Sequence, residues 1–331
     1  GEGRRPSYLS NAVELVVADV RDRAAVRRAL DGVDAVFHFA AMVGVGQSMY
    51  QVDDYVSVNE RGTAVLMEAL IERPVERLVV ASSMSVYGEG LYRSARGDLI
   101  GGAHRPLEAL RRGDWELRDD DGSALRPVPT TEDKAVTLES VYALSKFQQE
   151  RLCLLLGRAY DIPTVALRFF NVYGTRQALS NPYTGVLAIF ASRLLNGQRP
   201  LVFEDGEQRR DFVSVRDVAR ACRLALESPD VAGEVLNVGG GRSYTIGGIA
   251  ARMARILGRD DLRPEIRGKQ RLGDVRHCFA DIGRASRRLG YEPLVELERG
   301  LEELATWLER QSPRDRVLEA RAELDRRGLT L

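Results

Sequence analysis

Cysteine is scarce in this sequence of 331 residues, and it is not arranged for bonding or metal binding. Cys153, Cys222 and Cys278 lie far apart and form no CxxC pair, which disfavours a disulfide framework or a zinc knuckle. We expect three buried thiols and a protein of the reducing cytoplasm. His38 and His277 lack metal-ligand spacing with each other or with the third histidine, so the sequence predicts no metal site.

Net charge and long apolar runs are also missing. Lysine plus arginine and aspartate plus glutamate each total 48, so the overall charge favours neither nucleic acid nor a membrane surface as a partner. No apolar run approaches the roughly 20 residues that span a bilayer. The first ten residues do not resemble a signal or transit peptide. These absences predict a soluble protein.

The first half of the chain alternates short apolar runs with helical patterns. Uniformly apolar strands spaced by crossover helices indicate a parallel sheet covered on both faces, which is a doubly wound, Rossmann-like α/β fold. Ligands of such sheets bind at the carboxyl ends of the strands. The expected strands are Val13 to Ala18, Ala35 to Phe39, Leu78 to Ala81 and Thr164 to Leu167, and the expected helices are Arg23 to Leu30, Val52 to Ile71 and Ser140 to Tyr160.

Beyond Asn171 the elements become shorter and less regular. We expect residues 1–170 to form the large domain and residues 171–331 to form mainly a smaller α/β substrate domain, with the binding cleft between them. Residues 91–136 are charged and lack a sustained period, which indicates an insertion. Helices are expected at Gly185 to Asn196, Val215 to Glu227, Thr245 to Leu257, Asp281 to Leu289, Leu294 to Arg310 and Asp315 to Arg327, with strands near Leu201 to Phe203 and Val235 to Val238.

One group of polar residues suggests proton transfer. Ser83 ends an expected strand, and Tyr142 and Lys146 lie four residues apart near the start of a long expected helix. Residues at this spacing share one helix face, so the lysine cation could favour the phenolate, and Ser83 could share the proton. A tyrosine and a lysine at this spacing also occur by chance, and only the surrounding sequence gives the pair weight.

Five motifs follow one another in the surrounding sequence, namely Val80 to Gly88 (VASSMSVYG), Tyr142 to Lys146 (YALSK), Leu167 to Gly174 (LRFFNVYG), Arg210 to Val213 (RDFV) and Leu236 to Gly239 (LNVG). Together they resemble the extended short-chain dehydrogenase/reductase family that acts on nucleotide sugars, over nearly the whole chain. The resemblance implies an NAD cofactor, with Tyr142 as the acid/base, Lys146 lowering its pKa and binding the nicotinamide ribose, and Ser83 assisting.

The same resemblance implies two sets of binding residues. For the nucleotide-sugar substrate, a UDP- or dTDP-hexose, Asn171, Arg210 and Arg271 hold the diphosphate, Asp274 holds the nucleotide ribose, and Phe203 packs near the base. Arginine forks suit phosphate oxygens, although each arginine could instead be an ordinary surface charge. For NAD, the implied residues are Asp19 and Val20 near adenine, Phe39, Ala40 and Ala41 under the dinucleotide, and Asn59 near the ribose.

One part of the family pattern is not found before Asp19. The family begins with a strand, a glycine-rich turn and a helix that receives the pyrophosphate. The start Gly1-Glu2-Gly3 follows no strand and opens no helix, so we expect the first βαβ portion to be missing, most simply from a partial chain, and NAD binding by this chain to be weak. Gly239-Gly240-Gly241 is better explained as a loop before a helix capped by Thr245.

The residues after Ser83 favour one reaction within the family. Related dehydratases and decarboxylases carry an acidic residue there, whereas this chain has Met84 and Ser85. The sequence therefore predicts a 4-epimerase that oxidises a UDP- or dTDP-hexose at C4 and reduces the 4-keto sugar on its other face. A dehydratase or decarboxylase would need an acid from elsewhere, for instance Glu132 or Asp133. A non-catalytic NAD- or sugar-binding regulator remains the other alternative.

The two long helices of the first half also bear on assembly. Val52 to Ile71 and Ser140 to Tyr160 carry apolar residues on more than one face. The family pairs the equivalent helices, and the resemblance therefore implies a homodimer.

Overall fold

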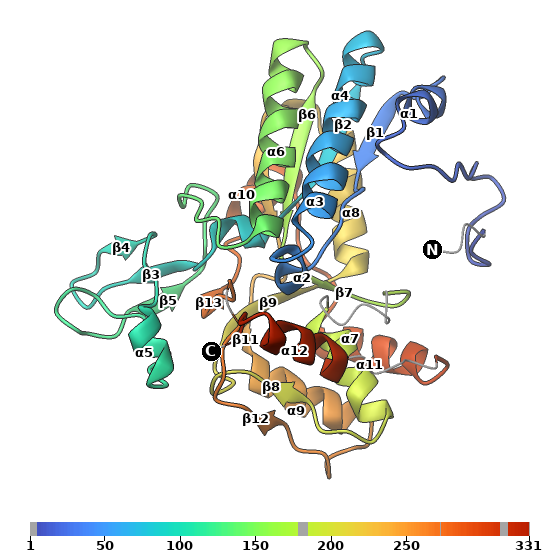
Figure 1. Cartoon of the computed structure of the whole chain (residues 1–331). Coiled ribbons are helices and arrows are strands. Elements are labelled where there is room, and N and C mark those ends of the chain that lie inside the picture. The colour runs from blue at the N-terminus through green and yellow to red at the C-terminus, as the bar shows by residue number, and fades with distance from the viewer. Residues whose placement is uncertain (1–4, 178–184, 272, 312–316, 331) are drawn as a thin grey trace.

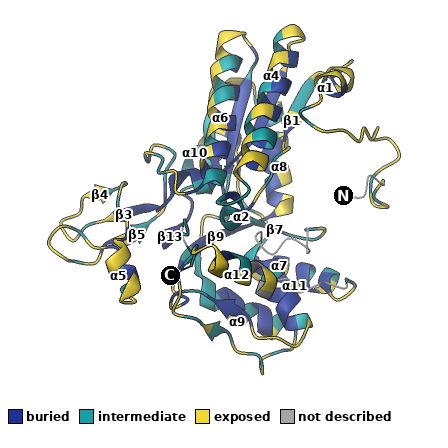
Figure 2. Ribbon diagram, viewed as in Figure 1, coloured by how far each residue is buried: buried dark blue, intermediate teal, exposed yellow. Residues whose placement is uncertain are grey.

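A four-stranded parallel sheet forms the centre of the large domain in the computed structural model, which describes residues 5–177, 185–271, 273–311 and 317–330 (Figure 1). The strand order is β1 (Ala35–His38), β2 (Arg77–Ser83), β6 (Thr164–Phe169) and β10 (Val235–Val238). Every residue of β2 is buried, as expected for a strand covered on both faces (Figure 2). The predicted doubly wound α/β architecture is confirmed.

Helices cover both faces of this sheet. Alternate residues of β2 enter two separate apolar clusters, with Leu78 and Val80 in one and Val79 in the other. The first cluster packs against α1 (Arg23–Ala29), α4 (Gly62–Glu72) and α6 (Val141–Ala159), and the second against α8 (Val215–Glu227) and α10 (Gly283–Leu289). Cys153 lies in the first cluster and Cys222 in the second, and with Cys278 they are the three buried free thiols predicted.

The boundary predicted at residue 170 does not separate the two domains in space. Strand β10 pairs with β6 in parallel, from Val235 opposite Ala166 to Val238 opposite Phe169. Since α8 and α10 pack with it, the chain returns to the large domain after first entering the small one. Such a return depends on pairing between residues about seventy positions apart, which a local pattern does not reveal.

The segment from Val13 to Ala18 is not the strand that its apolar residues predicted. Val13, Leu15, Val16 and Val17 are all exposed, and no strand of the described residues pairs with them (Figure 2). A β-strand needs a neighbour that satisfies its backbone N–H and C=O groups, so apolar composition alone does not create one.

The helix predicted from Val52 to Ile71 is present, with a change of pitch inside it. It comprises α3 (Val52–Tyr55), a π-helical segment (Val56–Arg61) and α4. Gly62 follows the π segment, and a side chain there would lie 2.5 Å from the Val20 methyl group, so glycine permits this close packing. π-Helical turns inside α-helices are frequent at functional sites.

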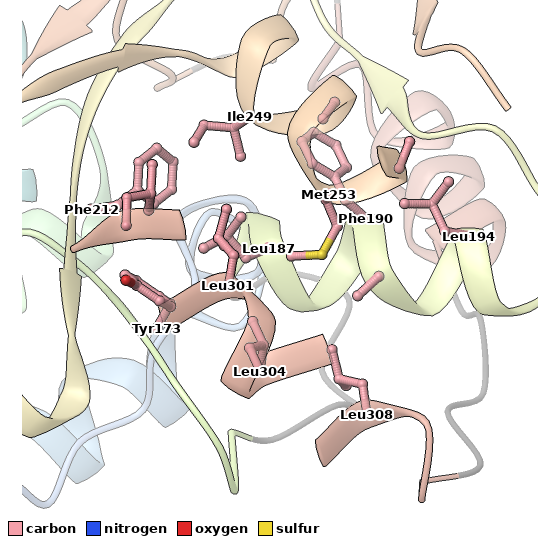
Figure 3. Packing of buried hydrophobic residues seen from close by; sticks show 14 of the residues in the cluster. Tyr173, Leu187, Phe190, Leu194, Phe212, Ile249, Met253, Leu301, Leu304 and Leu308 are labelled. Carbon is pink, nitrogen blue, oxygen red and sulfur yellow. The ribbon is translucent and has the colours of Figure 1, made fainter. Parts of the chain in front are cut away.

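The small domain has its own apolar core. Figure 3 shows side chains from several of its elements converging, among them Phe190, Phe212, Met253 and Leu301. Its helices are α7 (Val186–Leu195), α9 (Ile246–Ile256), α11 (Leu297–Leu308) and α12 (Val317–Arg326), and its strands are β7 (Asn171–Tyr173), β8 (Leu201–Val202), β9 (Arg209–Ser214), β11 (Ser243–Thr245), β12 (Glu265–Ile266) and β13 (His277–Cys278). The predicted Thr245 cap is confirmed, since its hydroxyl accepts from the Gly248 N–H.

The predicted insertion is a small unit that projects from the large domain (Figure 1). It contains β3 (Leu91–Arg93), β4 (Leu99–Ile100), α5 (Leu107–Arg111) and β5 (Arg126–Val128), with antiparallel pairing in the order β4-β3-β5. Tyr92, Leu117 and Leu125 form its buried core. Across the described residues, no helix is long and apolar enough to cross a membrane.

Candidate active site

A cavity of about 590 Å³ lies at the carboxyl ends of β2 and β6, where residues from both domains meet. This is where ligands of parallel sheets bind. Residues singled out in the sequence line it, among them Phe39, Ala41, Ser83, Met84, Ser85, Tyr142, Lys146, Asn171, Arg210 and Asp274, whereas Phe203 and Arg271 are not among its lining residues.

The first turn of α6 places Tyr142 in this cavity. Ser140 caps the helix by accepting from the Ala143 N–H at 3.1 Å, and the Tyr142 N–H donates to the Ser48 hydroxyl at 3.0 Å. The Tyr142 ring also meets the Tyr55 ring edge to face, with centroids 6.4 Å apart. These contacts fix the start of the helix, and with it the position of the phenol.

The Tyr142 phenol and the Ser83 hydroxyl share a hydrogen bond. Burial raises the pKa of the Tyr142 phenol, and a hydrogen bond with the Ser83 hydroxyl acts in the opposite direction and lowers this pKa. Ser83 is buried, at the end of β2. The pair can therefore pass a proton between two hydroxyl groups at the cavity wall.

Lys146 lies one turn further along α6, with a partner that the sequence did not predict. Its ammonium donates to the Gln149 side-chain oxygen at 2.8 Å. Burial lowers the pKa of Lys146 to about 8, which leaves its charge sensitive to pH near neutrality. The lowering of the Tyr142 pKa by Lys146, which the family resemblance implies, stays a prediction.

Behind Lys146 the Gln149 amide is fixed by buried partners. Its nitrogen donates to the Thr63 hydroxyl at 2.8 Å and to the Ala40 carbonyl at 3.3 Å. His38, predicted to be a core residue, lies 2.8 Å from the same hydroxyl. Burial, followed by the charge of Lys146, lowers the pKa of His38 to about 4. His38 is therefore neutral beside the lysine at physiological pH.

Asn59 is a buried residue of the π-helical segment. Its amide nitrogen donates to the Met42 carbonyl at 3.0 Å and to the Ser145 hydroxyl at 2.9 Å, and its oxygen accepts from the Met42 N–H at 2.7 Å. Asn59 thus joins the chain just after Ala41 to the helix that carries Tyr142 and Lys146. It supports the cavity wall and is not one of the cavity-lining residues.

The other residues implied for the cofactor fall into two places. Phe39 and Ala41 line the cavity, and Phe39 is half exposed, with its ring and the Phe169 ring in an edge-to-face arrangement. Asp19 and Val20 are not among the residues that line it. Arg21 lies 2.6 Å from the Asp19 carboxylate, and this hydrogen-bonded contact lowers the Asp19 pKa to about 2.

Three of the five residues implied for the substrate form one ionic cluster. Asp274 lies 2.8 Å from Arg271 and 3.4 Å from Arg210, and the Arg271 guanidinium stacks 4.7 Å from the centre of the Phe203 ring. Asn171 lies beside the cluster, where its amide donates to the Asp211 carbonyl at 2.8 Å. The structure therefore brings Phe203, Arg210, Arg271 and Asp274 together from three separate segments.

The acids considered for elimination chemistry do not reach the cavity. The Glu132 carboxylate accepts from the Asn237 N–H at 2.8 Å, and Asp133 is exposed and paired with Arg284. Neither lines the cavity, whereas Met84 and Ser85 do. Sequence reasoning missed the role of Gln149, for which the only signal was a polar residue one turn beyond Lys146 on a helix face that is otherwise buried.

Comparison with known proteins places this site in a family. Residues 2–108 and 120–239 match the NAD dependent epimerase/dehydratase family. The chain belongs to that family. It is 34% identical to a dTDP-L-rhamnose 4-epimerase of Burkholderia thailandensis over 94% of this chain and 85% of that protein. It is 30% identical to a putative UDP-glucose 4-epimerase of Methanocaldococcus jannaschii over 91% of this chain and 85% of that protein.

Solved structures agree with this membership. A UDP-glucose 4-epimerase of Thermotoga maritima with UDP-glucose has a TM-score of 0.72 at 30% identity, covering 88% of this chain and 83% of that one. A UDP-glucuronic acid 4-epimerase of Bacillus cereus, in complex with UDP-glucuronic acid and NAD, also has a TM-score of 0.72 at 27% identity, covering 88% and 80%. The resemblance seen in the sequence motifs is therefore confirmed.

Proposed function

We propose that this protein is an NAD-dependent nucleotide-sugar 4-epimerase. The observation that carries the proposal is the composition of the cavity wall, where Ser83, Tyr142 and Lys146 stand together and Met84 and Ser85 occupy the neighbouring positions. One phenol and one hydroxyl provide a single proton-transfer unit, which suffices for oxidation and reduction at one carbon.

The residues around Lys146 fit a nicotinamide cofactor. Lys146 is a buried cation that donates to Gln149, and an ammonium carries three N–H groups, so it can also donate to a ribose hydroxyl. Phe39 and Ala41 add apolar lining to the same cavity, and between them the Ala40 carbonyl accepts from Gln149, the partner of Lys146. NAD supplies a group that accepts a hydride from the sugar and returns it. We assign Lys146 to its ribose, Phe39, Ala40 and Ala41 to its face, and Asp19 and Val20 to its adenine end.

The substrate we propose is a UDP- or dTDP-hexose. Both a diphosphate and a ribose need charged or polar partners. Arg210 and Asp274, which line the cavity with Tyr142, and Arg271, which pairs with Asp274, supply them. Asn171 adds an amide on the diphosphate side, and Phe203 a ring for the base. The protein's own residues then act in sequence. Tyr142 takes the proton of the C4 hydroxyl, Ser83 shares it, and Tyr142 returns it once the 4-keto sugar has been reduced on its other face.

A 4,6-dehydratase or a decarboxylase is the second candidate, because sequence relatives carry those names. A dTDP-glucose 4,6-dehydratase of Actinoplanes is 27% identical over 88% of this chain. Elimination needs an additional acid or base at the sugar, and Glu132 and Asp133 are engaged elsewhere. A non-catalytic binder is disfavoured for the opposite reason, since the proton-transfer residues are intact.

The proposal is tested by incubating the protein with UDP-glucose, UDP-galactose or dTDP-hexoses and separating the products by chromatography, with NAD in large excess because its binding is expected to be weak. We expect interconversion of one nucleotide hexose with its C4 epimer. Binding of NAD and sugar nucleotide without any conversion would instead support the regulator.

We further propose a homodimer in the cytoplasm. Val52 and Val56 at the start of the long helix, and Leu144 and Leu155 on α6, are large apolar side chains exposed on the two helices expected to pair. Light scattering after gel filtration at micromolar concentration tests this, and a monomer would contradict it. The proposed location in the cytoplasm is supported by the three free cysteines, because thiols stay reduced in that compartment.

A further inference from the structure

The insertion contacts the small domain through buried charges. Arg105, between β4 and α5, is the centre of this contact, and its side chain is only 3% exposed. Its guanidinium lies 2.6 Å from a Glu204 oxygen and 3.2 Å from a Glu89 oxygen, and it donates to the Asp274 main-chain carbonyl at 3.0 Å. One side chain of the insertion therefore holds three segments that are distant in sequence.

Two of these segments form the two sides of the site assigned to the nucleotide. Glu204 directly follows Phe203, whose ring is covered by Arg271 at 4.7 Å. Asp274 is the ion-pair partner of Arg271 at 2.8 Å. Arg105 binds the residue beside Phe203 through one nitrogen and the main chain of Asp274 through another, so it sets the separation between the two sides.

The backbone at Glu204 shows how tightly this side is held. Glu204 has a positive φ of 50°, a conformation that residues other than glycine seldom adopt without support. Its N–H donates to the Lys269 carbonyl at 2.8 Å, and its own carbonyl accepts from the Gly268 N–H at 3.0 Å. The Glu204 side chain is buried between two guanidinium groups, those of Arg105 and Arg276.

Arg276 completes the network from the other direction. Its side chain is 1% exposed and lies 2.8 Å from Glu204 and 2.6 Å from Asp205, and it also pairs with Glu116 of the insertion. The main-chain N–H of Arg276 donates to a Glu89 carboxylate oxygen at 2.7 Å. The insertion thus contributes the Arg105 cation, which pairs with Glu204, and the Glu116 anion, which pairs with Arg276. Removal of either side chain leaves its buried partner with a charge that is less well compensated.

We propose that the insertion positions the nucleotide-binding segments of the substrate site, with Arg105 as its positioning residue. The inference rests on the proposed nucleotide-sugar substrate and adds the element of the fold that sets the affinity of the protein for the nucleotide. Arg105 does not line the cavity that contains Ser83 and Tyr142. Its loss therefore affects binding of the nucleotide and leaves the proton transfer intact.

The test is Arg105→Met in the full chain, which keeps an unbranched apolar stem and removes the guanidinium with its charge and donors. We expect the Kd for UDP or dTDP, measured by calorimetry, and the KM for the nucleotide sugar to rise about 10-fold, with kcat within about 2-fold of wild type. Arg96→Met is the matched control, because Arg96 belongs to the same insertion and its side chain is 77% exposed. We expect it to bind as wild type.

A double-mutant cycle identifies the route of the effect. If Arg105 acts through Glu204, the pair Arg105→Met and Glu204→Gln weakens binding no more than the stronger single change. Additive losses, or unchanged Kd and KM in Arg105→Met, would overturn the inference. If Arg105→Met does not fold, Arg105→Lys is used instead, because lysine keeps the charge but cannot donate to Glu204 and Asp274 through two separate nitrogens. Wild-type nucleotide binding by Arg105→Lys would equally overturn the inference. Wild-type protein that binds neither UDP nor dTDP would contradict the proposed substrate instead.

Discussion

The Lys146 ammonium lies 2.8 Å from the Gln149 side-chain oxygen, so the lysine of the catalytic cavity is held by an amide three residues further along α6. That amide is fixed in turn by Thr63 of α4 and the Ala40 carbonyl at the end of β1. The position of Lys146 therefore depends on three elements of the large domain, and Gln149 is the residue that joins them.

The first prediction follows from this contact. In Gln149→Leu the buried ammonium loses an acceptor that favours its charged form, so its pKa, already lowered by burial to about 8, falls further. We expect the alkaline limb of the kcat/KM profile to move to lower pH. Gln148→Leu is the control, since Gln148 is exposed on the same helix, and it leaves the profile unchanged. An unmoved limb in Gln149→Leu would show that the amide does not position the lysine.

The second prediction concerns the acid/base. Tyr142→Phe removes the titrating oxygen and keeps the ring against Tyr55, so the fold persists while turnover falls by about 10² to 10⁴. Tyr160→Phe, at the exposed end of α6, serves as the control and retains activity. Steady-state kinetics with circular dichroism compares the two, and full turnover in Tyr142→Phe would reject the assignment.

Ser83 supports a third prediction about the same phenol. The Ser83 hydrogen bond lowers the pKa of Tyr142, so its removal in Ser83→Ala raises that pKa. A base works only when deprotonated, and the limb of the kcat/KM profile that rises with pH therefore shifts to higher pH. Ser85→Ala, which removes the nearby hydroxyl of Ser85, is the comparison. An equal shift in both variants would mean that Ser83 has no special role.

The fourth prediction is a stability change with pH at His38. Its pKa is lowered from 6.5 to about 4 in the fold, so between these values the unfolded chain binds more protons. The free energy of unfolding is therefore unaffected by His38 above pH 6.5. It decreases as the pH falls toward 4, by up to about 3 kcal/mol, because protonation of His38 favours the unfolded chain. We expect His38→Gln to flatten this decline in urea unfolding, and His104→Gln, at an exposed position of the insertion, to leave it unchanged. A decline as steep in His38→Gln as in wild type would assign the pH dependence to other groups.

Much of this site followed from local sequence. Periodicity and apolar pattern within single segments sufficed to place several residues. They placed Tyr142 and Lys146 at helical spacing, Ser83 at a strand end, and the cysteines and His38 in the core. The family resemblance supplied Phe203, Arg210, Arg271 and Asp274. The fold explains why Arg210 and Asp274 meet, since Arg210 donates to the main-chain carbonyls of Val275 and Arg276 just before β13.

What the sequence did not reveal depends on contacts between distant segments. Strand β10 joins the large sheet by pairing with β6, and the Val13 to Ala18 segment stays unpaired despite its apolar residues. The network of Arg105, Glu204 and Arg276 is made of charged residues that resemble surface groups until folding buries them together. Charge identity carries no local sign of burial, so such a network is visible only in three dimensions.

The most direct test of the central claim is the reaction run in D2O with NAD and the nucleotide hexose that the protein converts, followed by mass spectrometry of the product. Because the hydride that leaves C4 returns to C4, and Tyr142 exchanges only a hydroxyl proton, the account predicts a C4 epimer of unchanged mass with no deuterium on carbon. Loss of water or carbon dioxide, or deuterium bound to carbon in the product, would contradict it.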